Sequence, residues 1–265
     1  TTRSMSLTDE GQRFLEEAQP SLQGLRQALQ SARRAKDEIA GPLRIVGPRT
    51  TFQSMLWRLL DAFCEQYPGI VPDVTLDDRV GNWVEDRVDV GFRIGTSPHE
   101  GVVARRLFPL QLVVCASPAY LRRHGVPDSL GALQSHRCSV YRNPTTGRIV
   151  PWRFKVSGED HEQPVVPALY TNDEVLELEA VLAGKVMAQL AGVTAGPYIR
   201  AGQLVPLLVD HMPDRASYFV YYGSRAAQPV RVRAFIDFTI ARLHRDCAYV
   251  LGDKELRDAA QRARG

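Results

Sequence analysis

LRIVGPRTTFQSMLWRLLDAFCEQYPGIVPDVTLD, residues 43–77, decides the fold class of this chain. Residues 43–47 are an apolar run typical of a buried strand, and residues 51–66 carry apolar side chains at helical spacing. After the Pro68-Gly69 turn, residues 71–77 predict a second strand. A strand, a helix and a strand in this order predict a parallel sheet covered by helices. We therefore expect an α/β fold.

The same alternation continues towards the C-terminus, so further sheet is expected there. The predicted elements are a short helix at 80–86, strands at 88–95 and 110–117, a helix after Pro118, a helix at 173–184, a strand at 185–192, a helix around Tyr198, a strand at 218–223 and a helix at 230–246. The loop-rich stretch at 130–170 predicts the start of a second lobe.

Residues 8–41 differ from the rest because they are rich in helix formers and end at Gly41-Pro42. Leucines and alanines at seven-residue intervals form a narrow apolar seam, whose leucines are Leu15, Leu22, Leu25 and Leu29. A seam on a helix about 45 Å long predicts a partner helix. We expect this helix to make a homodimer; the alternative is that the seam packs on its own domain.

Composition excludes several classes of function. The 265 residues hold 33 Lys and Arg against 30 Asp and Glu, a net charge of +3, which is too balanced for a chain that binds nucleic acid along its whole length. The four cysteines show no C-x-x-C pair and the six histidines no metal-ligand spacing, so we expect no metal. No apolar run is long enough for a membrane span and no secretory signal is evident. These features favour a cytoplasmic protein without a membrane partner.

Enzyme motifs are also missing from the sequence. It contains no G-x-S-x-G, H-E-x-x-H or G-x-G-x-x-G, and Gly184-Lys185 is followed by Val186 rather than by the Ser or Thr of a Walker loop. The pair Glu177 and Glu179 is typical of a solvated helix face. We expect neither catalytic activity nor a cofactor.

Several motifs, in order, carry a resemblance to one family. They are TTRSMSLTDEGQRFL, GPLRIVGPRTTF, FCEQYPGIVPDVTLDD, DVGFRIG, LVVCASPAYLRRHGVP, TNDEVLELEAVLAG, AGQLVPLLVD and VRVRAFIDFTIARL. Together they resemble the LysR-type transcriptional regulators over nearly the whole chain, up to about residue 246. One departure is AGKVMAQLAGVTAGPYI, where many relatives have Gly-x-Gly-Ile and then Leu-Pro.

The resemblance implies a periplasmic-binding-protein-like effector domain of two lobes behind a long dimerisation helix. Residues 1–7 would be the remnant of the wing of a winged helix-turn-helix, and residues 8–41 the linker helix. Residues 42–246 would be the effector-binding domain, with lobe I at about 42–115 and 222–246 and lobe II at about 118–218. The strands that cross between the lobes are expected near 115–118 and 218–223. No role is assigned to the tail, residues 247–265.

Effector sites of such domains lie in the cleft, at strand ends and helix N-termini. The effector-binding candidates are Pro48, Arg49, Thr50, Thr51, Ile94, Gly95, Thr96, Ser117, Asn172, Asp173 and Tyr221. Thr50, Thr51 and Asn172 are equally suited to capping helices. Arg49 favours an anionic effector, although it is also able to pair with Asp173 or to face water.

The resemblance implies that Arg3 contacts DNA and that the recognition helix lies in a DNA-binding domain upstream of Thr1. The hypothesis is a dimeric regulator, with tetramers left open, that responds to a small molecule. Two alternatives remain: a two-lobe binding module without a DNA-binding role, and a short antagonist of full-length regulators.

Overall fold

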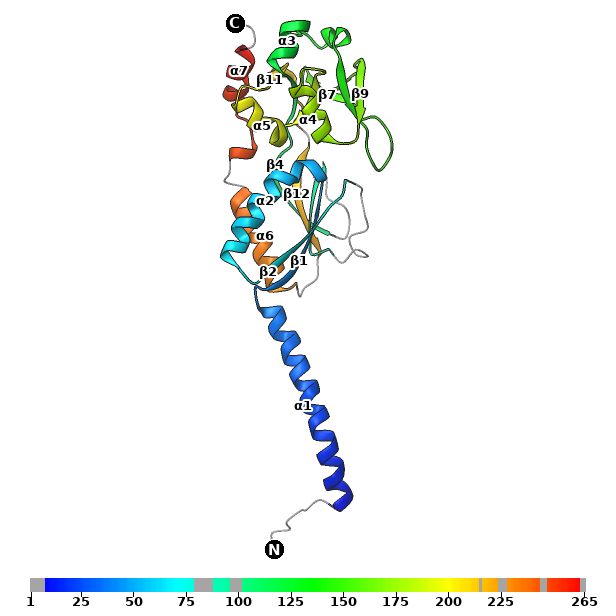
Figure 1. The fold of residues 1–265 in the computed structure, drawn as a ribbon, viewed down its shortest axis with the longest axis vertical. Coiled ribbons are helices and arrows are strands. Elements are labelled where there is room, and N and C mark those ends of the chain that lie inside the picture. The colour runs from blue at the N-terminus through cyan, green and yellow to red at the C-terminus, as the bar shows by residue number, and fades with distance from the viewer. Residues whose placement is uncertain are drawn as a thin grey trace.

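The protein consists of two α/β lobes and one long helix that projects away from them (Figure 1). The computed structural model describes residues 8–78, 88–95, 102–214, 216–223, 228–243 and 247–262. The expected wing at 1–7 with Arg3, the short helix at 80–86 and Thr96 lie outside these residues. The predicted α/β class with two lobes is confirmed.

Lobe I is built on a five-stranded sheet in the order β2-β1-β3-β12-β4. Its strands are β1 (Gly41–Gly47), β2 (Ile70–Leu76), β3 (Val90–Gly95), β4 (Val102–Pro109) and β12 (Ser217–Gly223). β1 is parallel to β2 and β3, whereas β12 is antiparallel to β3 and β4. Helices α2 (Arg49–Gln66) and α6 (Val230–Leu243) pack on the sheet, and Phe63, Phe92 and Phe235 meet in its core.

Lobe II is built around strand β5 (Leu112–Ala116), which pairs antiparallel with β10 (Ala188–Ala191) and β11 (Val205–Leu207). Two smaller sheets complete it: β6 (Cys138–Tyr141) with β9 (Pro167–Thr171), and the hairpin of β7 (Trp152–Val156) and β8 (Glu159–Gln163). Its helices are α3 (Pro118–His124), α4 (Glu174–Leu182) and α5 (Gly192–Arg200), with short 3-10 turns at η1 (Gly131–Ser135) and η2 (Val209–His211).

The chain passes between the lobes at other positions than the sequence predicts. β4 belongs to lobe I and β5 to lobe II, so the first passage is at Leu110 and Gln111, before the expected 115–118. The return ends before Ser217, because Tyr218 already pairs with Ile94 and Phe108 in lobe I. The first passage therefore precedes the expected 115–118, and the return lies directly before the expected strand at 218–223. Residues 110–117 are apolar except for Gln111 and Ser117, and no Gly or Pro among them marks the change of sheet.

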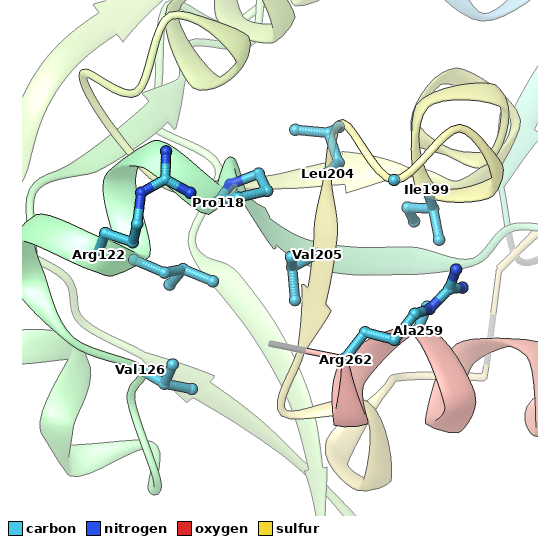
Figure 2. A pocket seen from close by; sticks show the side chains of 10 residues that line it. Pro118, Arg122, Val126, Ile199, Leu204, Val205, Ala259 and Arg262 are labelled. Atoms are coloured by element: carbon cyan, nitrogen blue, oxygen red, sulfur yellow. The ribbon is translucent and has the colours of Figure 1, made fainter. Parts of the chain in front are cut away.

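The C-terminal tail, to which the sequence assigns no role, is part of lobe II. Helix α7 (Asp253–Gln261) follows the turn η3 (Cys247–Tyr249) and buries Leu256 and Ala259 in the lobe II core. Together with α3, α5 and β11 it encloses a cavity of about 450 Å³, where Arg122 and Arg262 lie on opposite sides of apolar residues such as Val205 (Figure 2).

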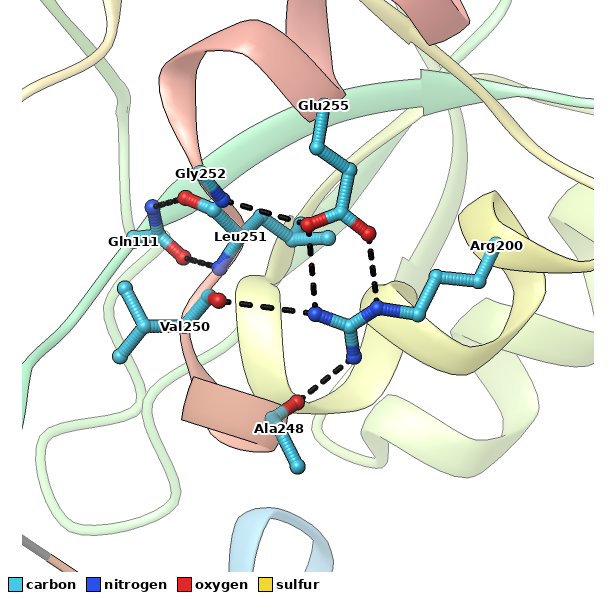
Figure 3. A network of polar contacts seen from close by, with 7 residues as sticks. All are labelled: Gln111, Arg200, Ala248, Val250, Leu251, Gly252 and Glu255. Atoms are coloured by element: carbon cyan, nitrogen blue, oxygen red, sulfur yellow. Dashed lines mark hydrogen bonds and ion pairs between the residues drawn. The ribbon is translucent and has the colours of Figure 1, made fainter. Parts of the chain in front are cut away.

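A network of polar contacts fixes this tail where it crosses between the lobes (Figure 3). The side-chain amide of Gln111 donates to the Leu251 carbonyl oxygen and accepts from the Leu251 N–H, each at 2.8 Å. Arg200 contacts Glu255 at 2.7 Å and donates to the Ala248 carbonyl oxygen at 2.6 Å. Leu110 N–H donates to the Ala216 carbonyl oxygen at 2.9 Å. The chain thus passes between the lobes three times, at Leu110 and Gln111, at Ala216 and at Leu251, and these three passages lie side by side.

Helix α1 (Asp9–Asp37) carries the leucine seam away from both lobes (Figure 1). Leu15, Leu22 and Leu25 are 44%, 58% and 58% exposed, and Phe14 beside them is 73% exposed. The Leu29 side chain lies outside the described residues. Over its described leucines, the seam therefore does not pack on its own domain. None of the helices in the described part of the chain is both long and apolar enough to cross a bilayer.

Replacing Gln111 with Ala is expected to lower the free energy of unfolding by about 2 kcal/mol. Both backbone groups of Leu251 would lose their partners in a largely buried place, which costs more than the loss of an exposed hydrogen bond. Urea titration measures the change, with Gln203→Ala as an exposed control expected within about 0.5 kcal/mol of the parent. Equal losses in the two variants would contradict the role of Gln111.

Candidate functional site

A cavity of about 310 Å³ lies between the two lobes, a volume at the lower end of small-molecule sites. Lobe I and the first passage contribute Pro48, Asp78, Ile94 and Leu110. Lobe II contributes Leu112, Tyr141, Val150, Pro151, Trp152, Arg153, Glu174, Glu177, Gln189 and Ala191. Because both lobes line it, any change in their arrangement changes the cavity.

Strand ends place the lobe I residues at one edge of the sheet. Pro48 follows β1, Asp78 follows β2 and Ile94 is near the end of β3, and these parallel strands all end on the same side. The Asp78 carboxylate accepts a hydrogen bond from the backbone N–H of Arg49 at 2.8 Å. An acceptor at the start of helix α2 suits the positive end of the helix dipole and holds Asp78 at the cavity.

Helix α4 presents two carboxylates from lobe II. Asp173 caps this helix by accepting from the Leu176 N–H at 3.0 Å, which places Glu174 and Glu177 in the first turn. Glu174 accepts from the Ala191 N–H at 3.2 Å. Glu177 is only 3% exposed, so its carboxylate lies in the wall of the cavity rather than in water.

The electrostatic environment of the cavity is negative. Burial raises the pKa of Glu177 to about 7; the Ser139 hydroxyl lowers this pKa and the Glu174 charge raises it. Burial likewise raises the pKa of Tyr141 well above its usual range, and the carboxylates of Asp78, Glu174, Glu177 and Asp173 raise it further. Carboxylates from both lobes thus act on the same phenol.

Side chains of β7 and β10 give the cavity a fixed polar and aromatic wall. The Trp152 indole N–H donates to the Ser139 carbonyl oxygen at 3.1 Å and orients the ring. The Gln189 amide accepts from the Arg153 N–H at 2.9 Å and donates to the Arg153 carbonyl oxygen at 2.7 Å. The arrangement is suited to holding a small molecule with an apolar body and a polar group.

Few of the residues predicted from sequence line this cavity. Pro48 and Ile94 do. Arg49 has an exposed side chain and offers its backbone N–H to Asp78, while the Thr50 and Thr51 side chains lie outside the described residues. Gly95 pairs with Ser217, and Asn172 is exposed.

The remaining candidates have structural roles. Ser117 caps α3, accepting from the Tyr120 N–H at 3.3 Å, and Asp173 caps α4. Tyr221 is buried in β12 between β3 and β4.

Sequence reasoning missed most of the polar wall. It assigned Glu177 to a solvated face, which is wrong because this side chain is buried; Glu179 is exposed as expected. A signal was present: Glu174, Glu177, Leu178 and Val181 lie at i, i+3, i+4 and i+7, which is one helix face. Asp78, Tyr141, Trp152 and Gln189 carry no comparable local signal.

The larger cavity under α7 is the weaker candidate for a switch. Its lining residues all come from lobe II, so its shape does not depend on how the lobes sit. No group of three or more His, Cys, Asp or Glu side chains in the described ranges is placed to hold a metal ion.

Two α/β lobes around a shared cavity, tied by side-by-side passages, define a periplasmic-binding-protein-like ligand-binding domain. The family model of the LysR substrate binding domain matches residues 36–243. The chain belongs to the LysR family of transcriptional regulators, which confirms the resemblance seen in its sequence.

Relatives with names and solved structures agree with this. An HTH-type transcriptional regulator of Xanthomonas campestris is 31% identical, over 100% of this chain and 78% of its own length. CrgA of Neisseria meningitidis serogroup C is 30% identical, over 92% and 81%. The structure of the full-length AphB N100E variant superposes with a TM-score of 0.77 at 25% identity, covering 90% of this chain and 81% of AphB. The CrgA structure gives 0.69 at 27%, covering 92% and 82%. The relatives are regulators, which opposes a binding module without a DNA-binding role.

The buried carboxylate predicts a pH-dependent stability that Glu177→Gln removes. Because the pKa is raised from 4.5 to about 7 on folding, the folded protein keeps a proton that the unfolded chain releases, and stability falls as pH rises through this window. Between pH 5.5 and pH 8, the free energy of unfolding of Glu177→Gln is expected to rise relative to that of the parent by on the order of 2 kcal/mol. Urea titrations at both pH values test this. Exposed Glu179→Gln is the control, and a pH-independent difference for Glu177→Gln would contradict the assignment.

Proposed function

We propose that this chain is the ligand-sensing and dimerising part of a LysR-type regulator, and that a small effector binds in the cavity between its lobes. The observation that carries the proposal is that both lobes and the first passage line one cavity. A ligand that contacts both lobes binds one arrangement more tightly than another and so shifts the population of arrangements. That shift is relayed to the DNA-binding domains.

Helix α1 is proposed to make the homodimer, with tetramers as a further assembly. Its seam residues Leu15, Leu22 and Leu25 are exposed although leucine side chains favour burial, and a second copy of the helix would cover them. Leu29 continues the same seven-residue spacing. Arg3 is proposed to contact DNA, and the protein is proposed to act in the cytoplasm.

Five further effector candidates are neighbours in the sequence of the lining residues Pro48 and Ile94. Arg49, Thr50 and Thr51 begin α2 directly after Pro48, and Gly95 and Thr96 follow Ile94. We retain them as proposed contacts for an effector that extends beyond the cavity.

Asp substitution in the seam is expected to separate the dimer. The double variant Leu22→Asp, Leu25→Asp places charges where the second helix packs, and burying an unpaired charge is costly. Sedimentation velocity at micromolar concentration is expected to show a dimer for the parent and a monomer for the variant. Gln23→Asp, on the polar side of the same helix, is the control and should stay dimeric. A monomeric parent would contradict the seam assignment.

A bulky residue in the cavity is expected to abolish effector binding. A metabolite present at 100 times its Kd should stabilise the parent by about 2.7 kcal/mol, or roughly 5–10 °C in Tm for a chain of this size. Val150→Trp fills the cavity and should lose most of that shift, whereas Val166→Trp, at an exposed position of the same lobe, should keep it. Differential scanning fluorimetry of a metabolite library measures the effect. A hit that shifts both variants equally would place the site elsewhere.

A further inference from the structure

We propose that the cavity between the lobes selects a small organic cation, a protonated amine on an apolar or aromatic body. The inference rests on the proposed function of this cavity and adds the chemical class of the effector. It reverses the sequence-based expectation of an anionic effector, which depended on Arg49.

The charges that line the cavity favour a cation. Asp78 comes from lobe I, and Glu174 and Glu177 from helix α4 of lobe II. Arg153 is the single cation among the described lining residues, and its guanidinium already lies 3.6 Å from Glu162 on the neighbouring strand. The Arg49 guanidinium is exposed and is not part of the lining. The cavity therefore attracts a positive ligand.

The burial of Glu177 also favours a cation. Glu177 is 97% removed from water, so its carboxylate, once ionised, needs a partner for its charge, since an isolated buried charge is costly. Within the described residues, the Ser139 hydroxyl lies beside it, but a hydroxyl dipole does not neutralise a charge. An ammonium group in the cavity would supply the missing charge and donate hydrogen bonds to the carboxylate.

The volume and lining of the cavity determine the size and polarity of the uncharged part of the ligand. About 310 Å³ accommodates a molecule with one ring, and Ile94, Leu110, Leu112 and Trp152 supply apolar and aromatic contacts. The three carboxylates are not clustered as a metal site in the described part of the chain. An organic cation satisfies both the carboxylates and the apolar wall.

A bound cation would directly affect how close the two lobes lie. Asp78 on lobe I and the two glutamates on lobe II carry like charges across one gap, so their repulsion opposes the approach of the lobes. A cation between them replaces this repulsion with attraction on both sides. Binding is therefore tighter when the lobes are close, which is the differential affinity that a population shift requires.

Matched ligands of opposite charge provide the test. Isothermal titration calorimetry of the chain at pH 8 compares benzylamine, 2-phenylethylamine and tyramine with benzoate, phenylacetate and 4-hydroxyphenylacetate. At least one amine is expected to bind at least about tenfold more tightly than its anionic counterpart, the size expected for one charged hydrogen bond. Glu177→Gln and Asp78→Asn should each weaken that amine by about tenfold, and Glu179→Gln on the outer face of α4 should not.

The pH dependence of amine binding is a second test. If Glu177 had only a structural role, its ionisation would not change the affinity for amines. Among the described residues that line the cavity with Glu177, the titratable and charged ones are Glu174 on its own helix, Asp78 after β2, Tyr141 at the end of β6 and Arg153 in β7. Between pH 6 and pH 8 the amines stay protonated while Glu177 ionises, so their Kd should fall roughly tenfold. In Glu177→Gln this fall should disappear.

The outcomes separate this inference from the proposed function. Anions that bind as tightly as the amines, and lose binding in Val150→Trp, would overturn the cation class while leaving the cavity as the effector site. Amines that bind equally well to the parent, Glu177→Gln and Asp78→Asn would overturn the inference as well. Absence of amine binding at millimolar concentration would likewise reject it.

Discussion

The rest of the structure depends on one constraint, the side-by-side packing of the three passages between the lobes. Strand β12 has to return between β3 and β4, so the chain that builds lobe II leaves from and comes back to the same sheet. Leu110 bonds to Ala216, and Gln111 bonds to Leu251 of the third passage. These bonds fix where the lobes meet, and therefore where the cavity opens. Under the proposed function, these passages are the segments that bend when the lobes rearrange.

The cavity wall departs from the rules that make a stable core. Three carboxylates line it, one of them almost fully buried, and they add to the effect of burial, which raises the pKa of Tyr141. A hydrophobic replacement of the buried Glu177 would fold at least as well, since removing a charge from water destabilises the folded protein. Such departures concentrate at functional sites, where stability is lower because a ligand completes the interactions. The charge pattern is thus the most informative feature of this molecule about its effector.

Helix α1 also carries side chains that are unfavourable in the isolated chain. Its exposed leucines are a poor surface for a monomer but a suitable seam for a pair of helices. The seam and the cavity lie at opposite ends of lobe I, linked by β1, which begins four residues after α1 ends and reaches the cavity at Pro48. A change in lobe arrangement therefore has a short covalent path to the dimer helix.

The sequence alone determined the features that depend on neighbouring residues. Helical spacing and Gly41-Pro42 predicted α1, and the alternation over residues 43–77 predicted β1, α2 and β2. The caps of α3 and α4 were not predicted, because Ser117 and Asp173 were assigned to effector binding and capping was considered for Asn172 instead. Only the tertiary structure decided the passages, the docking of the tail and the cavity wall, because each joins residues far apart in the chain. Gln111 and Leu251 are 140 positions apart, and Asp78 and Glu177 meet only when two lobes fold. Local sequence patterns show helical or strand periodicity. Whether a charged side chain can bind a ligand depends on the residues from elsewhere in the chain that surround it.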